Sequence, residues 1–158
     1  MKNFNNKIFW FTGQPNSGKT TLSKQLIKTS FDANDYFFID GDELREMTKN
    51  FDYSEVGRRK NIQDAQLICS YLYNSGKNVI VAMVSPYRDM REDFKNKYPV
   101  NEIYLVSNRT GKDNYKIPYY EPPINNYFIL ETDKKTIDEC VNEINKYFSI
   151  NKKIEYIV

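Results

Sequence analysis

The 158-residue chain contains no histidine, which removes the commonest general base and every histidine-containing metal site. It has only two cysteines, Cys69 and Cys140, too few for a four-cysteine zinc site, so we predict buried thiols in a reducing compartment, the cytoplasm. No stretch approaches the roughly 20 apolar residues of a membrane span, and the amino terminus lacks the apolar core of a secretory signal. Catalysis would therefore depend on carboxylates, cations and backbone amides.

The chain also lacks a large excess of charge of either sign, because 23 basic and 21 acidic residues leave a net charge of only +2. This balance gives no overall attraction to nucleic acids or to an anionic membrane, so neither is expected as a partner. The chain is 40% hydrophobic, which suffices for one core, and its length fits a single domain over residues 1–158. A small anionic ligand would have to be held by local geometry.

What the sequence does contain is a regular alternation of strand and helix patterns. Short apolar runs at 7–12, 36–39, 79–84, 102–106 and 127–130 are typical of strands buried on both faces of a parallel sheet. Helices are predicted at 20–29, at 54–75, in a polar stretch that ends near 98, and from Thr132 or Asp133 onward. This order predicts an α/β fold, a three-layer α/β/α sandwich with a five-stranded, mainly parallel sheet.

Two helices carry apolar stripes that we expect to face the core. They comprise Val56, Ile62, Ala65, Cys69 and Leu72 in the long helix, and Ile137, Val141, Ile144 and Phe148 in the last one. Residues 107–126 show little periodicity and are predicted to form a loop long enough to be functional. The tail at 149–158 alternates apolar residues, which favours an edge strand or a subunit contact.

The strongest motif is GQPNSGKT at 13–20, which directly follows the first predicted strand and opens the first predicted helix. Its glycines let backbone amides point inward, and the helix amino terminus adds its dipole, so the loop can hold phosphate oxygens. Lys19 would reach the β and γ phosphates, and Thr20 would ligate Mg²⁺. The motif predicts the P-loop NTPase fold and an ATP site formed by Gly13, Gln14, Pro15, Asn16, Ser17, Gly18, Lys19, Thr20 and Thr21.

Two carboxylates follow the second predicted strand, in the sequence Asp40-Gly41-Asp42. Ligands bind at the carboxyl ends of strands in open parallel sheets, so either carboxylate is a candidate base for a substrate hydroxyl. The alternative is an Asp-Gly turn in which Asp42 caps the next helix. Both interpretations stay open on these residues alone.

Five blocks of the sequence form a recognisable set: GQPNSGKT at 13–20, IDGDELR at 39–45, RRKNI at 58–62, SPYR at 85–88 and YEPP at 120–123. With these blocks, in this order and spacing, the chain resembles the adenylyl-sulfate (APS) kinases. That family transfers the γ-phosphoryl group of ATP to the 3′-hydroxyl of a nucleotide whose 5′-phosphate carries a second acid group. The resemblance implies a homodimer as one expectation, since members are commonly dimeric. It also implies catalytic roles for Lys19, Asp40 and Asp42, and an acceptor site of Asp42, Arg45, Tyr53, Arg58, Asn61, Val84 and Ser85.

The resemblance departs from the family after the fourth predicted strand. Members usually have a helix and a basic lid there, with a Phe-Thr-Gly segment, whereas residues 107–126 are expected to form a shortened lid. Arg109, Lys112 and Lys116 are its candidate cations and Tyr115 its candidate stacking ring, but the base-clamping Phe is not recognisable. The predicted acceptor is therefore adenylyl sulfate or, as in the related cytidine diphosphoramidate kinases of capsule biosynthesis, a cytidine nucleotide.

Three other interpretations fit a P-loop. A nucleotide-dependent switch would carry a guanine-reading Asn-Lys-x-Asp or a switch Asp-x-x-Gly, and neither pattern occurs. A motor ATPase normally has an acidic residue after the strand at 79–84, where this chain has Ser85-Pro86. A degenerate kinase without an acceptor is disfavoured by Arg45, Arg58 and Asn61.

Overall fold

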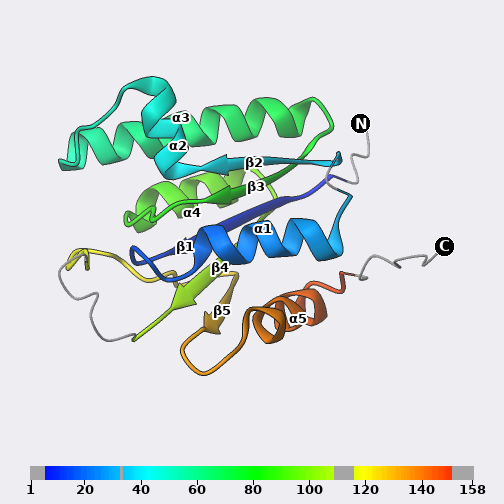
Figure 1. Cartoon of the computed structure of the whole chain (residues 1–158). Helices are drawn as coiled ribbons and strands as arrows, with labels where there is room; N and C mark the ends of the chain where they lie inside the picture. Colours follow the sequence, from blue (N-terminus) through cyan, green and yellow to red (C-terminus); the bar gives the residue numbers. More distant parts are fainter. Residues whose placement is uncertain (1–5, 33, 109–115, 151–158) are drawn as a thin grey trace.

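A five-stranded parallel sheet forms the middle layer of the computed structural model, which describes residues 6–32, 34–108 and 116–150 (Figure 1). The strands are β1 (Ile8–Gly13), β2 (Tyr36–Asp40), β3 (Asn78–Ala82), β4 (Val100–Val106) and β5 (Tyr127–Glu131). The helices are α1 (Lys19–Ser30), α2 (Gly41–Thr48), α3 (Glu55–Asn74), α4 (Arg88–Lys97) and α5 (Ile137–Tyr147). None of the helices in the described ranges combines the length and apolarity needed to cross a membrane.

The strand order is β2-β3-β1-β4-β5, and each neighbouring pair in the sheet is parallel. All carboxyl ends therefore lie along one edge, at the left of Figure 1, where the segment from residue 116 onward also runs. The predicted α/β/α sandwich with a five-stranded parallel sheet is confirmed. The chain order changes direction at β1, which places a topological switch point beside the phosphate loop.

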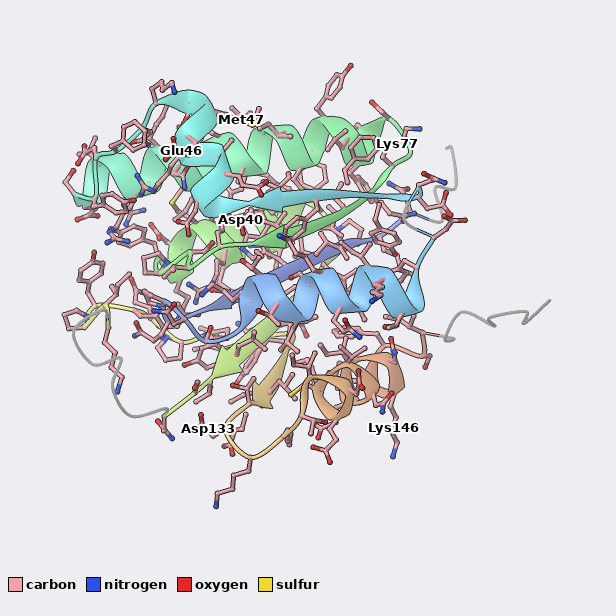
Figure 2. All side chains as sticks on the ribbon, viewed as in Figure 1. Asp40, Glu46, Met47, Lys77, Asp133 and Lys146 are labelled. Atoms are coloured by element: carbon pink, nitrogen blue, oxygen red, sulfur yellow. The ribbon has the colours of Figure 1, made fainter. Side chains whose placement is uncertain are left out.

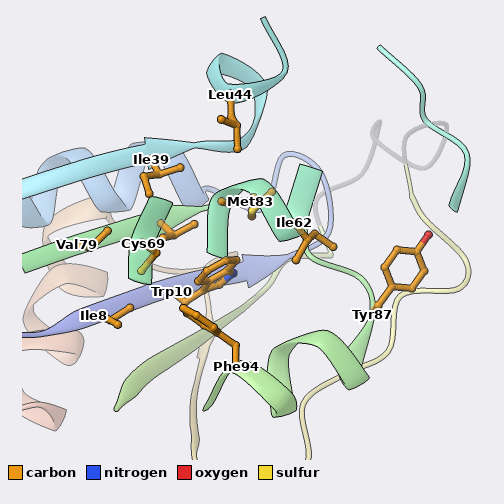
Figure 3. Close-up of a cluster of buried hydrophobic side chains, with 12 residues drawn as sticks. Ile8, Trp10, Ile39, Leu44, Ile62, Cys69, Val79, Met83, Tyr87 and Phe94 are labelled. Atoms are coloured by element: carbon orange, nitrogen blue, oxygen red, sulfur yellow. The ribbon is translucent and has the colours of Figure 1, made fainter. Parts of the chain in front are cut away.

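Alternating side chains of β1 point to opposite faces of the sheet and so build two separate cores. Ile8 and Trp10 pack with residues of α2, α3 and α4 on one face (Figure 3), whereas Phe9 and Phe11 pack with α1 and α5 on the other. Each fully buried side chain of this size contributes about 1.5–3 kcal/mol. Cys69 and Cys140 lie in these cores as predicted, and burial raises the pKa of the Cys69 thiol to about 12.

The last helix begins later than the sequence indicated. Its cap is Thr136, whose hydroxyl accepts from the amide of Glu139 while the Glu139 carboxylate accepts from the amide of Thr136. Thr132 and Asp133 are not the cap, because their side chains bond elsewhere: Thr132 to the backbone of Ser17 and Asp133 to Ser107 and Asn108.

Three further predictions need correction. Val56 and Ile137 are 77% and 47% exposed and do not belong to the core. Each lies in the first turn of its helix. The third strand ends at Ala82 rather than at 84, because Ser85 adopts a left-handed backbone with φ of 46° and turns the chain away from the sheet. The fourth strand starts at Val100, two residues before the predicted start at 102, where it already pairs with Ile8.

Candidate active site

The phosphate loop joins the end of β1 to the start of α1. Gly13 has φ of 150°, and a Cβ there would lie 2.5 Å from the carbonyl oxygen of Leu105, so β1 and β4 approach closely only because this residue is glycine. Gly18 and Asn16 have φ of 101° and 62°, left-handed conformations that curl the loop around the amino terminus of α1. The backbone therefore forms the predicted cradle for phosphate.

Lys19 lies almost wholly buried inside this loop. Its ammonium donates hydrogen bonds to the carbonyls of Gln14 at 2.7 Å and Gly13 at 3.2 Å. Burial lowers its pKa to about 8, and the negative charges of Asp42 and Asp40 counteract only part of this fall. The ammonium also donates to the Ser17 hydroxyl at 3.4 Å, so all of its hydrogen-bond partners in the described residues are neutral. A buried cation with neutral partners is well suited to bind an incoming phosphate.

Asp40 stands at the junction of β2 and α2 (Figure 2) and is committed to two structural tasks. Its Oδ1 accepts from the amides of Asp42 and Glu43, which makes Asp40, rather than Asp42, the cap of α2. Its Oδ2 accepts from the hydroxyl of Thr20 at 2.7 Å. Hydroxyl and carboxylate oxygens are the hard donors that Mg²⁺ prefers, so this pair fits the expected metal beside the phosphates.

Asp42 differs from Asp40 in its surroundings. It is exposed and lines the cleft described below, and no described residue is seen to hydrogen-bond with its carboxylate. Its charge acts on the pKa of Lys19, which places it near the phosphate loop. Asp42 therefore differs from Asp40 in presenting an exposed carboxylate to the cleft.

Arg45 is buried and holds the loop that follows α2. Its guanidinium donates to the carbonyls of Asn50 and Asp52, both at 2.9 Å, and lies 4.2 Å from the ring centroid of Tyr53. Burial lowers the pKa of Arg45 from its ordinary value. Arg58 lies 5.4 Å from the same ring and donates to the Tyr53 carbonyl. Tyr53 is thus presented to the cleft between two cations.

Three more predicted acceptor residues, Asn61, Val84 and Ser85, line the same cleft. Asn61 is buried, and its Nδ2 donates to the carbonyl of Gly41, while its Oδ1 has no hydrogen-bond partner among the described residues. Val84 and Ser85 follow β3, and the Ser85 hydroxyl accepts from the indole of Trp10 at 3.0 Å. Ser85 is therefore partly committed to the core, whereas Asn61 keeps an unused polar atom.

Residues 116–119 form the remaining wall, and within them the sequence pointed only to Lys116. Gln14 exchanges two hydrogen bonds with the backbone of Ile117, at 2.9 and 2.8 Å, and Tyr120 bonds to the hydroxyl of Thr12 at 2.8 Å. The Tyr-Glu-Pro-Pro block was a signal for this segment, but nothing in the sequence indicated Gln14 as its partner.

These elements enclose a cleft of about 810 Å³ at the carboxyl edge of the sheet. Of the predicted site residues, Gly13, Gln14 and Ser17 shape the loop without lining the cleft, and Arg109, Lys112 and Tyr115 lie outside the described residues. The predicted residues that line it are Pro15, Asn16, Gly18, Lys19, Thr20, Thr21, Asp40, Asp42, Arg45, Tyr53, Arg58, Asn61, Val84, Ser85 and Lys116. The lining residues that were not predicted are Gly41, Ile62, Ala82, Met83, Pro86, Ile117, Pro118 and Tyr119.

Comparison with known proteins identifies the family. Residues 5–113 match the family model described as adenylylsulphate kinase. The chain belongs to the adenylyl-sulfate kinase family. The match covers the phosphate loop, both aspartates and the Arg58 to Asn61 block.

Relatives named adenylyl-sulfate kinase match most of the chain. The adenylyl-sulfate kinase of Gloeothece citriformis is 31% identical over 85% of this chain and 89% of its own length. That of Staphylococcus epidermidis is 29% identical over 95% of this chain and 86% of its own length.

Solved structures agree on the fold. The Mycobacterium tuberculosis APS kinase in complex with AMPPNP and APS superposes with a TM-score of 0.74 at 21% identity, over 91% of this chain and 98% of that one. Shikimate kinase from Bacteroides thetaiotaomicron superposes less well, with a TM-score of 0.60 at 16% identity, over 91% and 99%. The P-loop kinase fold is therefore shared beyond the family.

Proposed function

We propose that this chain is an ATP-dependent adenylyl-sulfate kinase, which transfers the γ-phosphoryl group of ATP to the 3′-hydroxyl of adenylyl sulfate. The observation that carries the proposal is that one cleft is lined both by the phosphate loop and by Asp42, Arg58 and Asn61. A donor phosphate at Lys19 and an acceptor hydroxyl at Asp42 would then meet without a large rearrangement. Membership of the family and the APS-bound relative support the choice of acceptor.

In the proposed reaction, Asp42 takes the proton of the 3′-hydroxyl as that oxygen forms its bond to the γ-phosphorus. The bond between the γ-phosphorus and the bridging oxygen breaks, and ADP leaves with the electron pair. Asp42 is favoured over Asp40 because both oxygens of Asp40 already accept hydrogen bonds, from Thr20 and from the start of α2. Phosphoryl transfer needs mainly positioning and charge neutralisation, which this cleft can provide.

Lys19, Thr20 and Asp40 would hold the donor side. The Lys19 ammonium would exchange its carbonyl partners for phosphate oxygens, which are stronger acceptors. Thr20 and Asp40 would hold Mg²⁺, which neutralises phosphate charge when it is bound with ATP. The backbone amides around Gly18 would bind the remaining oxygens.

On the acceptor side, Arg58 and Asn61 would bind the 5′-phosphate and its sulfate. The planar guanidinium of arginine binds oxyanions through two parallel hydrogen bonds. The Tyr53 ring, exposed and flanked by Arg45 and Arg58, offers a stacking surface for the base. Lys116 adds a cation on the opposite wall.

The experiment that tests the proposal is an ADP-release assay with Mg·ATP and adenylyl sulfate, with the product identified by mass. Cytidine diphosphoramidate, which offers a 3′-hydroxyl on a smaller base, is the comparison acceptor. We expect turnover with adenylyl sulfate and at least tenfold lower kcat/KM with the cytidine nucleotide. The reverse order would assign the chain to a cytidine acceptor, and no turnover with either would refute kinase activity of this class.

A further inference from the structure

Gln14 makes a reciprocal pair of hydrogen bonds across a long sequence separation. Its Nε2 donates to the carbonyl of Ile117 at 2.9 Å, and its Oε1 accepts from the amide of Ile117 at 2.8 Å. One side chain thus bonds to both backbone polar groups of a residue 103 positions away, and the carbonyl of that residue also accepts from the amide of Tyr120 at 3.2 Å. We call this pair of bonds the Gln14–Ile117 clamp.

The clamp joins two parts of the cleft that bind different substrates in the proposed function. Gln14 belongs to the phosphate loop, and its own carbonyl accepts from the Lys19 ammonium at 2.7 Å. Ile117 is buried between Lys116 and Pro118, and this short segment, with Tyr119, lines the opposite wall of the cleft. Gln14 therefore contacts the donor site through its backbone and the acceptor wall through its side chain.

The rest of that wall is fixed from other directions. The Tyr120 hydroxyl bonds to Thr12, and the Glu121 amide donates to the carbonyl of Pro86 at 3.0 Å. The Tyr119 ring is stacked on Tyr87, with centroids 6.1 Å apart. Among the described residues, Gln14 is the side chain that hydrogen-bonds to the Ile117 backbone. Ile117 directly precedes Pro118 and Tyr119, which line the cleft.

We propose that Gln14 is a positioning residue that sets the acceptor-side wall, Lys116 to Tyr119, against the phosphate loop. Its side chain does not line the cleft, so it acts on the acceptor through this wall rather than by contact. This inference rests on the proposed kinase function. It predicts that loss of the clamp weakens acceptor binding much more than ATP binding, because the backbone of the phosphate loop is kept.

The test is the variant Gln14→Met, which preserves length and volume but removes both hydrogen bonds. We expect the KM for adenylyl sulfate to rise roughly 10-fold, as for the loss of two neutral hydrogen bonds, and the KM for Mg·ATP to change less than about threefold. Gln25→Met is the matched control, because Gln25 lies on α1 and does not line the cleft. Its side chain donates a hydrogen bond to the exposed Asp138. An equal rise in both KM values, or an unchanged acceptor KM, would overturn the proposal.

A double-mutant cycle with Tyr119→Ala separates positioning from a general effect on stability. If Gln14 acts through the wall, Gln14→Met should raise the acceptor KM less than about threefold in the Tyr119→Ala background. Full additivity of the two effects would contradict this route. Hydrogen exchange of the Ile117 amide gives a readout that needs no turnover, and it should accelerate in Gln14→Met but not in Gln25→Met. If the wild-type protein does not phosphorylate adenylyl sulfate, the proposed function fails, and unchanged Ile117 exchange would separately refute the clamp.

Discussion

The Thr20 hydroxyl donates a 2.7 Å hydrogen bond to Oδ2 of Asp40, and this bond ties the start of α1 to the end of β2. The two residues come from the phosphate loop and from the Asp-Gly-Asp block, which the sequence presents as separate motifs. This contact distinguishes the two aspartates of that block. Both carboxylate oxygens of Asp40 accept hydrogen bonds, whereas Asp42 is exposed in the cleft. In the proposed function, residues 40–42 therefore contribute to both the donor site and the acceptor site.

Replacement of the two aspartates should give different signatures. Asp42→Asn should lower kcat by about 10²- to 10⁴-fold, the usual contribution of a general base, and leave the thermal midpoint unchanged. Asp40→Asn should lower the thermal midpoint as well, because an amide has one acceptor oxygen and cannot bond both the start of α2 and the Thr20 hydroxyl as the two carboxylate oxygens do. Steady-state kinetics and thermal unfolding of both variants check this. Near-normal kcat in Asp42→Asn would remove that residue from the mechanism.

Arg58 should matter for the acceptor, in contrast to its near neighbour Lys60. Arg58→Ala should raise the KM for adenylyl sulfate by roughly 10- to 100-fold, because a charge-assisted hydrogen bond contributes about 1.5–3 kcal/mol. Lys60→Ala is the matched control, since Lys60 is exposed, pairs with Asp64 on the same helix and does not line the cleft. Equal effects of the two changes on the acceptor KM would show that only general charge is involved.

Most of the fold follows from local pattern. The phosphate loop is a contiguous motif between a buried strand and a helix, and the alternating apolar runs are enough to predict the parallel sheet. Ser54, which caps α3 through the Gly57 amide, is also next to the helix it starts. Such features are encoded within a few residues, so the sequence alone reveals them.

Other features were missed because a residue's partner is distant in sequence. Thr132 and Asp133 have the right chemistry for a helix cap, but Thr132 bonds to Ser17, so the helix begins at Thr136 instead. In the same way, Gln14 looks like a variable position of the phosphate loop until its bonds to Ile117 are seen. The different roles of Asp40 and Asp42 could not be separated by residue type, since both are aspartates and only the contact with Thr20 distinguishes them.

A buried ion cluster should contribute strongly to stability behind the cleft. Glu102 is almost fully buried. Its Oε1 lies 2.9 Å from Nε of Arg91, and its Oε2 lies 2.5 Å from Nζ of Lys95. Glu102→Gln should lower the free energy of unfolding by about 3 kcal/mol, because the buried Arg91 loses its counter-charge and Lys95 keeps only its pair with Glu92. Glu143→Gln is the control, since its pair with Lys135 is partly exposed and should contribute less than about 1 kcal/mol. Urea unfolding measures both, and equal losses would contradict the role of burial.

The pH dependence of ATP binding should report the unusual state of Lys19. Burial lowers its pKa to about 8 in the free protein, whereas bound phosphates would favour the charged ammonium and raise that pKa. ATP binding should therefore take up a proton above about pH 8, with affinity constant below that pH and falling by up to tenfold per unit above it. Calorimetry with a non-hydrolysable ATP analogue at pH 8.5, in buffers of different ionisation enthalpy, measures this uptake. Lys19→Met should bind weakly and without proton uptake, and the same uptake in that variant would assign the titration to another group.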